Sequence, residues 1–205
     1  VLIVGAVTTE EKKTTSRELI NPFTDDVSES DWFYFDVVFA YSLGLIDGKT
    51  ATRFAPKDNL TCAEAVKLAA CMHQLYTTGE VTLQNGSPEW YNSYADYAME
   101  AGIIDTYDYE WKSPITRSAY MEIFAKSLPE EALAPINTIE DDSIPDVPLN
   151  HPAAEAIYTL YRAGVVQGRD AETHECCPDS FILRCEVAAT ITRMMDNSTR
   201  IDFYM

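Results

Sequence analysis

The feature that most constrains the fold of this chain is a short signal that occurs three times. A glycine is followed by two apolar residues within "AYSLGLIDG", "AMEAGIIDT" and "LYRAGVVQG". Twelve residues before each glycine the chain has Trp32, Trp90 or Pro152, and each opens a run of apolar residues with helical spacing. A glycine after such a run is a common helix terminator. The chain is therefore expected to be a repeat protein.

A second helix is expected in each repeat, because a capped apolar pattern follows each glycine turn. The pattern is clearest in "NLTCAEAVKL", where Thr61 and Glu64 have the spacing of a capping box. Weaker versions are "PITRSAYMEIF" and "FILRCEVAATI". Apolar residues recur at i, i+3 and i+4 in all three stretches. Each repeat is thus predicted to contain a helix, a glycine turn, a loop and a capped helix.

The predicted repeats cover residues 23–77, 88–129 and 144–196, and residues 1–22 are predicted to be an N-terminal linker or extension. Polar, turn-rich segments separate the repeats. One helical pair buries too little apolar surface to be stable alone, so the three pairs should pack on one another. The prediction is an all-α fold with only minor short strands in loops. Pro152 is expected at the first position of its helix, where its missing N–H costs nothing.

Composition argues against several functional classes. With 46% hydrophobic residues, a chain of 205 residues can bury a real core. Its formal charge of −18 argues against nucleic acid as a partner, since backbone binding needs clustered Lys and Arg. No stretch approaches the ~20 apolar residues of a membrane span. Because the chain begins with Val1 and "VLIVGAV" is no complete signal peptide, we expect a piece of a longer or processed protein.

The chemistry-bearing residues form no familiar catalytic or metal motif. Five Cys is an odd number, and adjacent Cys176 and Cys177 lack the usual spacing of metal ligands. Buried or free thiols are expected, with no metal and no cofactor. His73, His151 and His174 are scattered, and no nucleophile elbow is present. We therefore expect a protein that is not an enzyme, although so acidic a chain leaves open a carboxylate pair for glycoside hydrolysis.

The three repeats resemble three consecutive S-layer homology domains, a family that anchors proteins to bacterial cell walls. The family opens with Phe-x-Asp-Val and then a Trp, as in "FTDDV" before Trp32 and in "IPDVPLNHP", where Pro152 takes the Trp place. Its Thr-Arg-Ala-Glu motif is similar to "LTCAE", with Cys62 in the Arg place, and to "ITRSA", which lacks the Glu. It is also similar to "LRCE", with Leu183 for Thr. The resemblance covers nearly all of residues 23–197.

The resemblance implies a fold, a ligand and a location. Three units of this family form a pseudo-threefold, three-pronged helical bundle. The grooves between units hold a secondary cell wall polysaccharide, often ending in a pyruvylated amino sugar, at the extracellular surface of a bacterium. The residues that the resemblance implies for ligand binding are Asp26, Trp32, Gly48, Trp90, Arg117, Asp146, Gly168 and Arg184. A guanidinium fits a ligand carboxylate, an aromatic face suits a sugar ring, and a glycine permits close backbone approach.

Structural roles compete with these functional ones. The two arginines stand at helix starts, where a cation is slightly unfavourable, so each should pair with an internal carboxylate or with a ligand. Core packing at a unit junction is favoured for Trp32 and Trp90. The early aspartates, Asp26 and Asp146, would cap the first helix or its turn. The last glycine of each turn would serve the turn itself.

No repeat keeps every residue of the family pattern. Cys62 removes a guanidinium, Thr106 replaces a turn glycine and Pro152 replaces a Trp. At most one or two grooves are expected to bind, and the groove at Cys62 should not bind an anionic sugar. The alternative is a degenerate module used for protein–protein assembly in a surface layer or filament. The lost residues favour assembly, whereas the surviving Arg117 and Arg184 favour anchoring.

Overall fold

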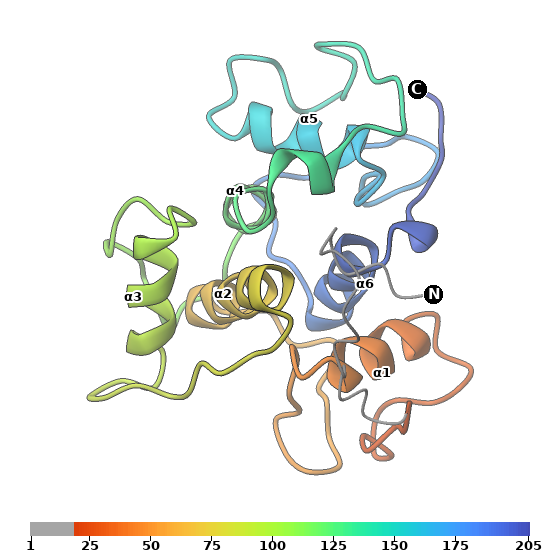
Figure 1. The fold of residues 1–205 in the computed structure, drawn as a ribbon. Coiled ribbons are helices and arrows are strands. Elements are labelled where there is room, and N and C mark those ends of the chain that lie inside the picture. Colours follow the sequence, from red (N-terminus) through yellow and green to blue (C-terminus); the bar gives the residue numbers. More distant parts are fainter. Residues whose placement is uncertain (1–18) are drawn as a thin grey trace, which may run out of the picture.

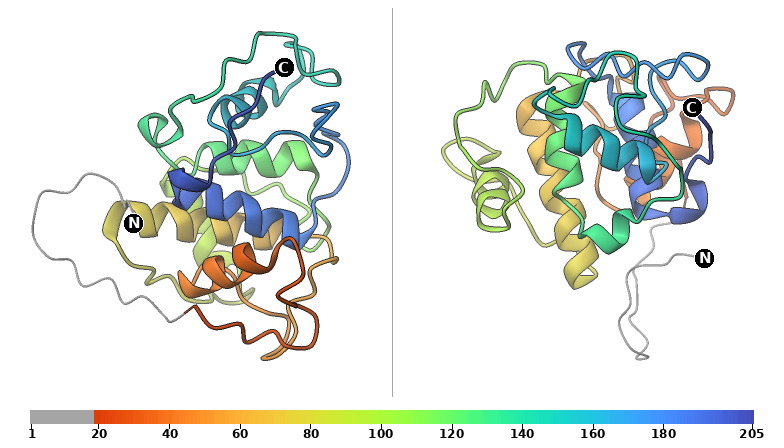
Figure 2. Two further views of the ribbon diagram at one scale, coloured as in Figure 1. Left: turned by 90° about the vertical axis from the view of Figure 1, so that its right-hand side faces the viewer. Right: turned by 90° about the horizontal axis from the view of Figure 1, so that it is seen from above.

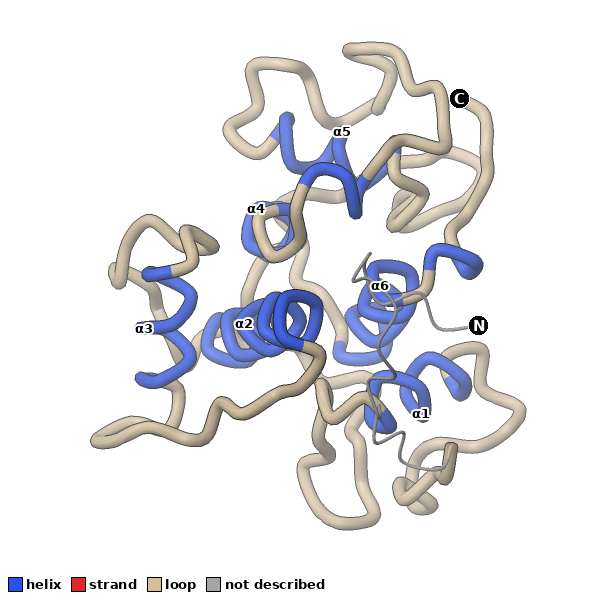
Figure 3. Tube along the Cα trace, in the orientation of Figure 1, coloured by secondary structure: helices blue, strands red, loops and turns tan. Residues whose placement is uncertain are grey.

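The computed structural model of the protein describes residues 19–205, so the predicted extension over residues 1–22 lies largely outside the described residues. Within this part the chain forms six α-helices and two short 3-10 helices (Figure 1). They are α1 Tyr34–Ser42, α2 Cys62–Thr78, α3 Asn92–Glu100, α4 Arg117–Ala125, η1 Glu130–Leu133, α5 Ala154–Arg162, α6 Arg184–Met195 and η2 Asn197–Thr199. Residues 19–205 contain no strand beyond three isolated β-bridges, which confirms the predicted all-α fold (Figure 3).

The second helix of each predicted repeat lies at the centre of the molecule. Helices α2, α4 and α6 gather in the middle, and α1, α3 and α5 lie outside them (Figures 1 and 2). Among these pairs, α3 packs on α2, α5 packs on α4 and α1 packs on α6. Each outer helix therefore packs on the inner helix of the preceding repeat, and the first repeat follows the third in this order.

Backbone hydrogen bonds join the starts of the three inner helices in a closed ring. The N–H of Leu60 donates to the carbonyl of Ile182 at 3.0 Å. The N–H of Ile182 donates to Ile115 at 3.4 Å, and the N–H of Ile115 donates to Leu60 at 2.9 Å. Because the cycle closes after three segments, these contacts are what a pseudo-threefold arrangement requires. For the bundle as a whole, that arrangement stays a prediction.

The inner helices begin where their capping residues predict. The side-chain oxygen of Thr61 accepts the N–H of Glu64, and the Glu64 carboxylate accepts the N–H of Thr61, as a capping box requires. Thr116 caps α4 through its side chain. At Leu183 only one half of a capping box is formed, because Glu186 accepts the Leu183 N–H at 2.9 Å but leucine has no side-chain acceptor. The predicted apolar positions are buried, namely Ala65, Leu68, Ala69, Met72, Tyr120, Ile123, Phe124, Val187, Ile191 and Met194.

The start of α5 differs from the prediction. Its first residue is Ala154 and its N-cap is Ala153, so Pro152 precedes the helix. The reason is a turn that begins at His151 and occupies the position where the first helical residue was predicted. The N–H of Ala153 donates to Nδ1 of His151, and the N–H of Ala154 donates to the His151 carbonyl at 3.0 Å.

The thiols behave as predicted. All five Cys are free, and four of them are buried. Burial raises the pKa of Cys71 to about 11, because the thiolate loses its hydration in this environment. The four buried cysteines therefore act as small apolar side chains of the core.

Three equivalent glycines end the outer helices, and they provide a test of the packing. Gly44, Gly102 and Gly164 have φ of 72°, 72° and 70°. A Cβ on Gly44 or Gly102 would meet nothing within 4 Å, whereas one on Gly164 would lie 2.6 Å from the Ile201 carbonyl oxygen. We predict that Gly44→Ala lowers the free energy of unfolding by about 1–2 kcal/mol through backbone strain alone. Gly164→Ala should lower it more, because a backbone carbonyl must also move.

Urea unfolding of the two variants and the parent measures both effects. Gly102→Ala is the control, since its site is as open as that of Gly44. Equal losses for Gly44→Ala and Gly164→Ala would contradict the described packing of the C-terminal segment on the third repeat.

Candidate functional site

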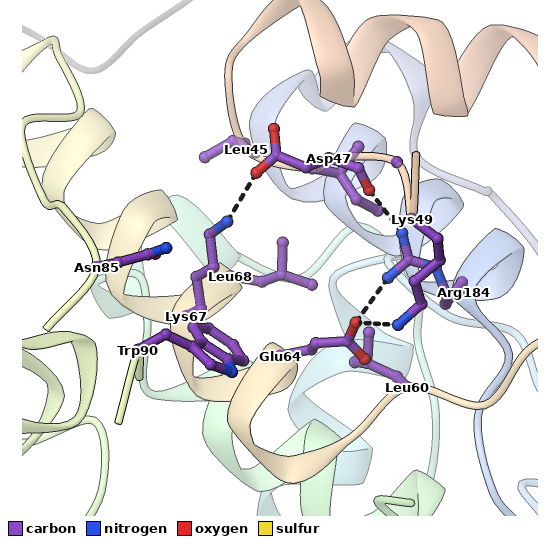
Figure 4. Close-up of a pocket in the computed structure, with 12 residues that line it drawn as sticks. Leu45, Asp47, Lys49, Leu60, Glu64, Lys67, Leu68, Asn85, Trp90 and Arg184 are labelled. Atoms are coloured by element: carbon purple, nitrogen blue, oxygen red, sulfur yellow. Dashed lines mark hydrogen bonds and ion pairs between the residues drawn. The ribbon is translucent and has the colours of Figure 1, made fainter. Parts of the chain in front are cut away.

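A pocket of about 230 Å³ lies between α2, the turn after α1 and the segment that leads into α3 (Figure 4). Its lining side chains come from all three predicted repeats. They are Leu45, Ile46, Asp47, Gly48, Lys49, Leu60, Glu64, Lys67, Leu68, Asn85, Trp90 and Arg184. The pocket thus brings together three of the predicted ligand residues, Gly48, Trp90 and Arg184.

Arg184, at the first position of α6, reaches from the third repeat into the first. Its Nη1 donates to the Glu64 carboxylate at 3.0 Å, Nε donates to the Phe54 carbonyl at 3.1 Å, and Nη2 donates to the Asp47 carbonyl at 2.6 Å. The guanidinium lies over the Phe54 ring, 4.7 Å from its centroid, and Arg184 is only 4% exposed. An internal carboxylate and two carbonyls therefore explain the cation at this helix start.

Arg117 occupies the same position of α4 and reaches from the second repeat into the third. Its Nη1 donates to the Glu186 carboxylate at 3.2 Å, and Nε donates to the Cys176 carbonyl at 2.7 Å. In the first repeat this helix position is Cys62, and in the second repeat the place of the glutamate is taken by Ala119. The contact between the first and second repeats therefore lacks both partners of the ion pair.

Asp26 and Asp146, predicted to cap the first helix or its turn, do not cap the first helices, whose N-caps Phe33 and Ala153 have no side-chain cap hydrogen bond. The Asp26 carboxylate accepts the N–H groups of Phe54 and the next residue, at 2.8 and 2.7 Å. Asp146 accepts in the same way from Cys176 and the residue after it. The second residue of each loop has a positive φ, which turns two successive N–H groups toward one anion. Each aspartate thus holds the loop whose carbonyl binds an arginine.

The two tryptophans differ in their surroundings. Trp32 is 64% exposed, so its predicted role in core packing is wrong. The neighbouring Phe33 takes the buried place, with 6% exposure, and Trp32 meets its ring edge-on. Trp90 is partly buried against the core and lines the pocket.

The last turn glycines are required by their close surroundings. A Cβ on Gly48 would lie 2.5 Å from the Phe23 ring and from the Thr50 carbonyl oxygen. Gly168 has a φ of +101°, and a Cβ there would lie 2.7 Å from the His174 backbone. Both glycines therefore serve the turn, as predicted, and Gly48 also forms part of the pocket wall.

Two lysines of the pocket were not predicted. Lys67 Nζ donates to the Asp47 carboxylate at 2.7 Å, and Lys49 Nζ donates to Glu64 at 2.6 Å. Burial opposes the charge of Lys67, but the hydrogen bond to Asp47 and the charge of that carboxylate together outweigh burial and raise the pKa of Lys67. Lys67 also lies 5.7 Å from the centroid of the Tyr94 ring. A signal was present, since Lys67 follows Glu64 by three residues and both lie on one face of α2.

The pocket has more positive than negative side chains. Three cations and two carboxylates line it, in a chain whose formal charge is −18. Trp90 adds an aromatic face, and Gly48 adds backbone without a side chain. The arrangement suits a ligand that has an anionic group and a flat apolar face.

Two stretches of the chain match the S-layer homology domain family, residues 23–66 and 143–173. They lie in the first and third predicted repeats, and the second predicted repeat lies outside them. The chain is also similar to the Surface-layer 125 kDa protein of Lysinibacillus sphaericus, with 28% identity over 112 residues. The alignment covers 50% of this chain but only 10% of that relative, so the chain spans a small part of its length.

The described part of the chain has neither a membrane-spanning helix nor a metal-binding cluster. Between residues 19 and 205, no helix combines the length and the apolar character needed to cross a membrane. In the same residues, no three His, Cys, Asp or Glu side chains are grouped so that they could hold a metal ion.

Removing the buried arginine of an ion pair between repeats should destabilise the fold. Arg184→Ala should lower the free energy of unfolding by about 3 kcal/mol, because Glu64 loses its buried partner and keeps only the half-exposed Lys49 as a cationic partner, and two loop carbonyls lose their donor. Lys126→Ala is the control. Its partner Asp105 is 78% exposed, and a surface pair contributes about 0–1 kcal/mol. Denaturant unfolding measures both, and similar losses would contradict the structural role of Arg184.

Acid should weaken the same ion pair. Burial disfavours charge on Glu64, but hydrogen bonds from Lys49 and the Thr61 N–H and the charge of Arg184 outweigh it, so the pKa of Glu64 lies below its usual range. The charged form therefore stabilises the fold above about pH 4.3, and this contribution disappears as the pH falls through the lowered pKa. We predict that Glu64→Gln is less stable than the parent at pH 7 and that the difference shrinks below about pH 4. A constant difference would contradict the assignment.

Proposed function

We propose that this chain is a non-catalytic anchoring module of a bacterial surface protein, located at the cell surface. Its ligand is an anionic secondary cell wall polysaccharide, held in grooves between the repeats. The observation that carries this proposal is the pocket, where Arg184, Gly48 and Trp90 from three predicted repeats meet with two further cations. The matches to the S-layer homology domain family and to a surface-layer protein support it.

The cyclic packing assigns each groove one residue from every repeat. The pocket, here the first groove, has its arginine from the third repeat, its glycine from the first and its Trp from the second. Applying the same order to the equivalent positions defines two more grooves. The second groove would contain Cys62, Thr106 and Pro152, and the third groove would contain Arg117, Gly168 and Trp32.

The three departures at the Arg, Gly and Trp positions therefore fall in one groove, although they come from three different repeats. The second groove also lacks the lysines of the first, since Lys49 corresponds to Tyr107 and Lys67 corresponds to Glu122. Nearby carboxylates add to its negative charge. Burial raises the pKa of Tyr109, and the charges of Glu122 and Asp105 raise it further. We infer that the second groove does not bind the anionic polymer and that the first and third do.

The strongly acidic composition does not oppose this proposal at short range. The Debye length at physiological ionic strength is about 8 Å, so exposed charges beyond that distance are largely screened. The cations that line the first groove would lie much closer than this to a ligand bound in it. Local charge therefore decides whether an anionic group binds.

Retention on purified cell-wall sacculi tests the function. We predict that the 205-residue chain is retained on sacculi that carry their secondary polymer and is lost when the polymer has been extracted. Trp90→Ala should weaken retention about tenfold, which corresponds to ~1.4 kcal/mol. Tyr107→Ala, in the second groove, is the control and should bind like the parent.

Two results would contradict the proposal. Retention that does not depend on the polymer would exclude it as the ligand. An equal loss for Trp90→Ala and Tyr107→Ala, with both variants folded, would remove the distinction between the grooves. No retention on either preparation of sacculi would favour the alternative, a module used for protein–protein assembly.

A further inference from the structure

The arginine of the first groove is largely engaged by internal partners. Three of the five N–H groups of Arg184 donate to Glu64 and to two backbone carbonyls, and the guanidinium lies over the Phe54 ring. Because Arg184 is only 4% exposed, its two remaining N–H groups have little access to a carboxylate from solution. Moving the guanidinium toward solvent would leave Glu64 or a buried carbonyl unsatisfied, which is unfavourable.

The two lysines differ from Arg184 because they are accessible. The side chains of Lys67 and Lys49 are 21% and 39% exposed. Their partners are not equivalent, since the Asp47 carboxylate is 63% exposed and the Glu64 side chain is 18% exposed. Glu64 is also fixed by Arg184 and by the helix cap, whereas within residues 19–205 the Asp47 carboxylate is held by one side chain, that of Lys67 (Figure 4). Because its carboxylate faces solvent, the pair of Lys67 and Asp47 is closer to a surface ion pair, which contributes little free energy, than the pair of Arg184 and Glu64 is.

We propose that the anionic group of the ligand binds Lys67 by displacing Asp47, with Lys49 beside it, and that Arg184 is a positioning residue. Arg184 holds the Glu64 carboxylate and the backbone at Asp47, and so fixes both lysines through their partners. Asp47 then acts as an internal competitor that lowers the affinity of the empty groove. This inference rests on the proposed function and identifies the contacts within that groove.

The chain contains a matched control for the competitor. Asp105 is the counterpart of Asp47 in the second repeat. It pairs with Lys126 at 2.6 Å and is 78% exposed, so it has a similar bond and a similar exposure. It belongs to the groove that lacks Arg, Gly and Trp. Removing its charge therefore changes the net charge of the protein as Asp47→Asn does, without changing the first groove.

The experiment is calorimetric titration of the whole chain with purified secondary wall polymer. Asp47→Asn should bind about threefold or more tightly than the parent, because Lys67 then has no internal anion to release. Lys67→Met should bind about tenfold more weakly, since a charge-assisted hydrogen bond is lost while the apolar stem remains. Lys67→Arg should recover much of the affinity, and Asp105→Asn should match the parent.

Salt dependence separates contact from positioning. Lys67→Met should flatten the fall of affinity with added NaCl, because one ligand-contacting charge is missing. Arg184→Lys should weaken binding but keep the salt dependence of the parent, because it changes the position of the lysines and not their number.

The results separate the competitor role of Asp47, the ligand contact of Lys67 and the proposed function. If the parent binds and Asp47→Asn binds equally or more weakly, the competitor role is wrong, and the proposed function stands. If Lys67→Met binds like the parent, Lys67 is not the contact. If the parent does not bind the polymer, the proposed function fails, and this inference fails with it.

Discussion

The arrangement of this protein depends on arginines that cross from one predicted repeat to the next. Arg184 and Arg117 are each 4% exposed, and charges with so little exposure are costly unless paired. Each finds a glutamate and a loop carbonyl in the following repeat, and an aspartate holds the same loop from its other side. These contacts fix the turn against the inner helix. The groove therefore results from the contacts that hold the repeats together.

This dependence explains why one contact between repeats differs from the other two. Between the first and second repeats neither the arginine nor the glutamate is present, since Cys62 and Ala119 stand in their places. Loss of only one partner would leave a charge uncompensated, and loss of both avoids this. Burial raises the pKa of the Cys62 thiol, and the charge of Glu110 adds to the effect. The two positions that hold the ion pair elsewhere thus have neutral residues here.

The sequence predicted the inner helices well, because capping residues and apolar spacing are local signals. It placed Trp32 in the core wrongly, since the neighbouring Phe33 provides the buried ring and spacing alone does not distinguish adjacent aromatics. It also could not show which arginine meets which glycine. That relation depends on the cyclic packing of outer helices on the preceding repeat, which appears only in three dimensions. The role of Lys67 was missed for the same reason, because its partner Asp47 lies in a turn twenty residues earlier.

The central claim is that the losses in three repeats fall in one groove and leave two grooves able to bind. The most direct measurement is the shift of backbone amide NMR signals when the labelled chain is titrated with soluble polymer fragments. We expect changes at Gly48 and Gly168, the turn glycines of the first and third grooves, and none at Thr106 in the second. Changes at Thr106 as large as those at Gly48, or an unaffected Gly168, would contradict it.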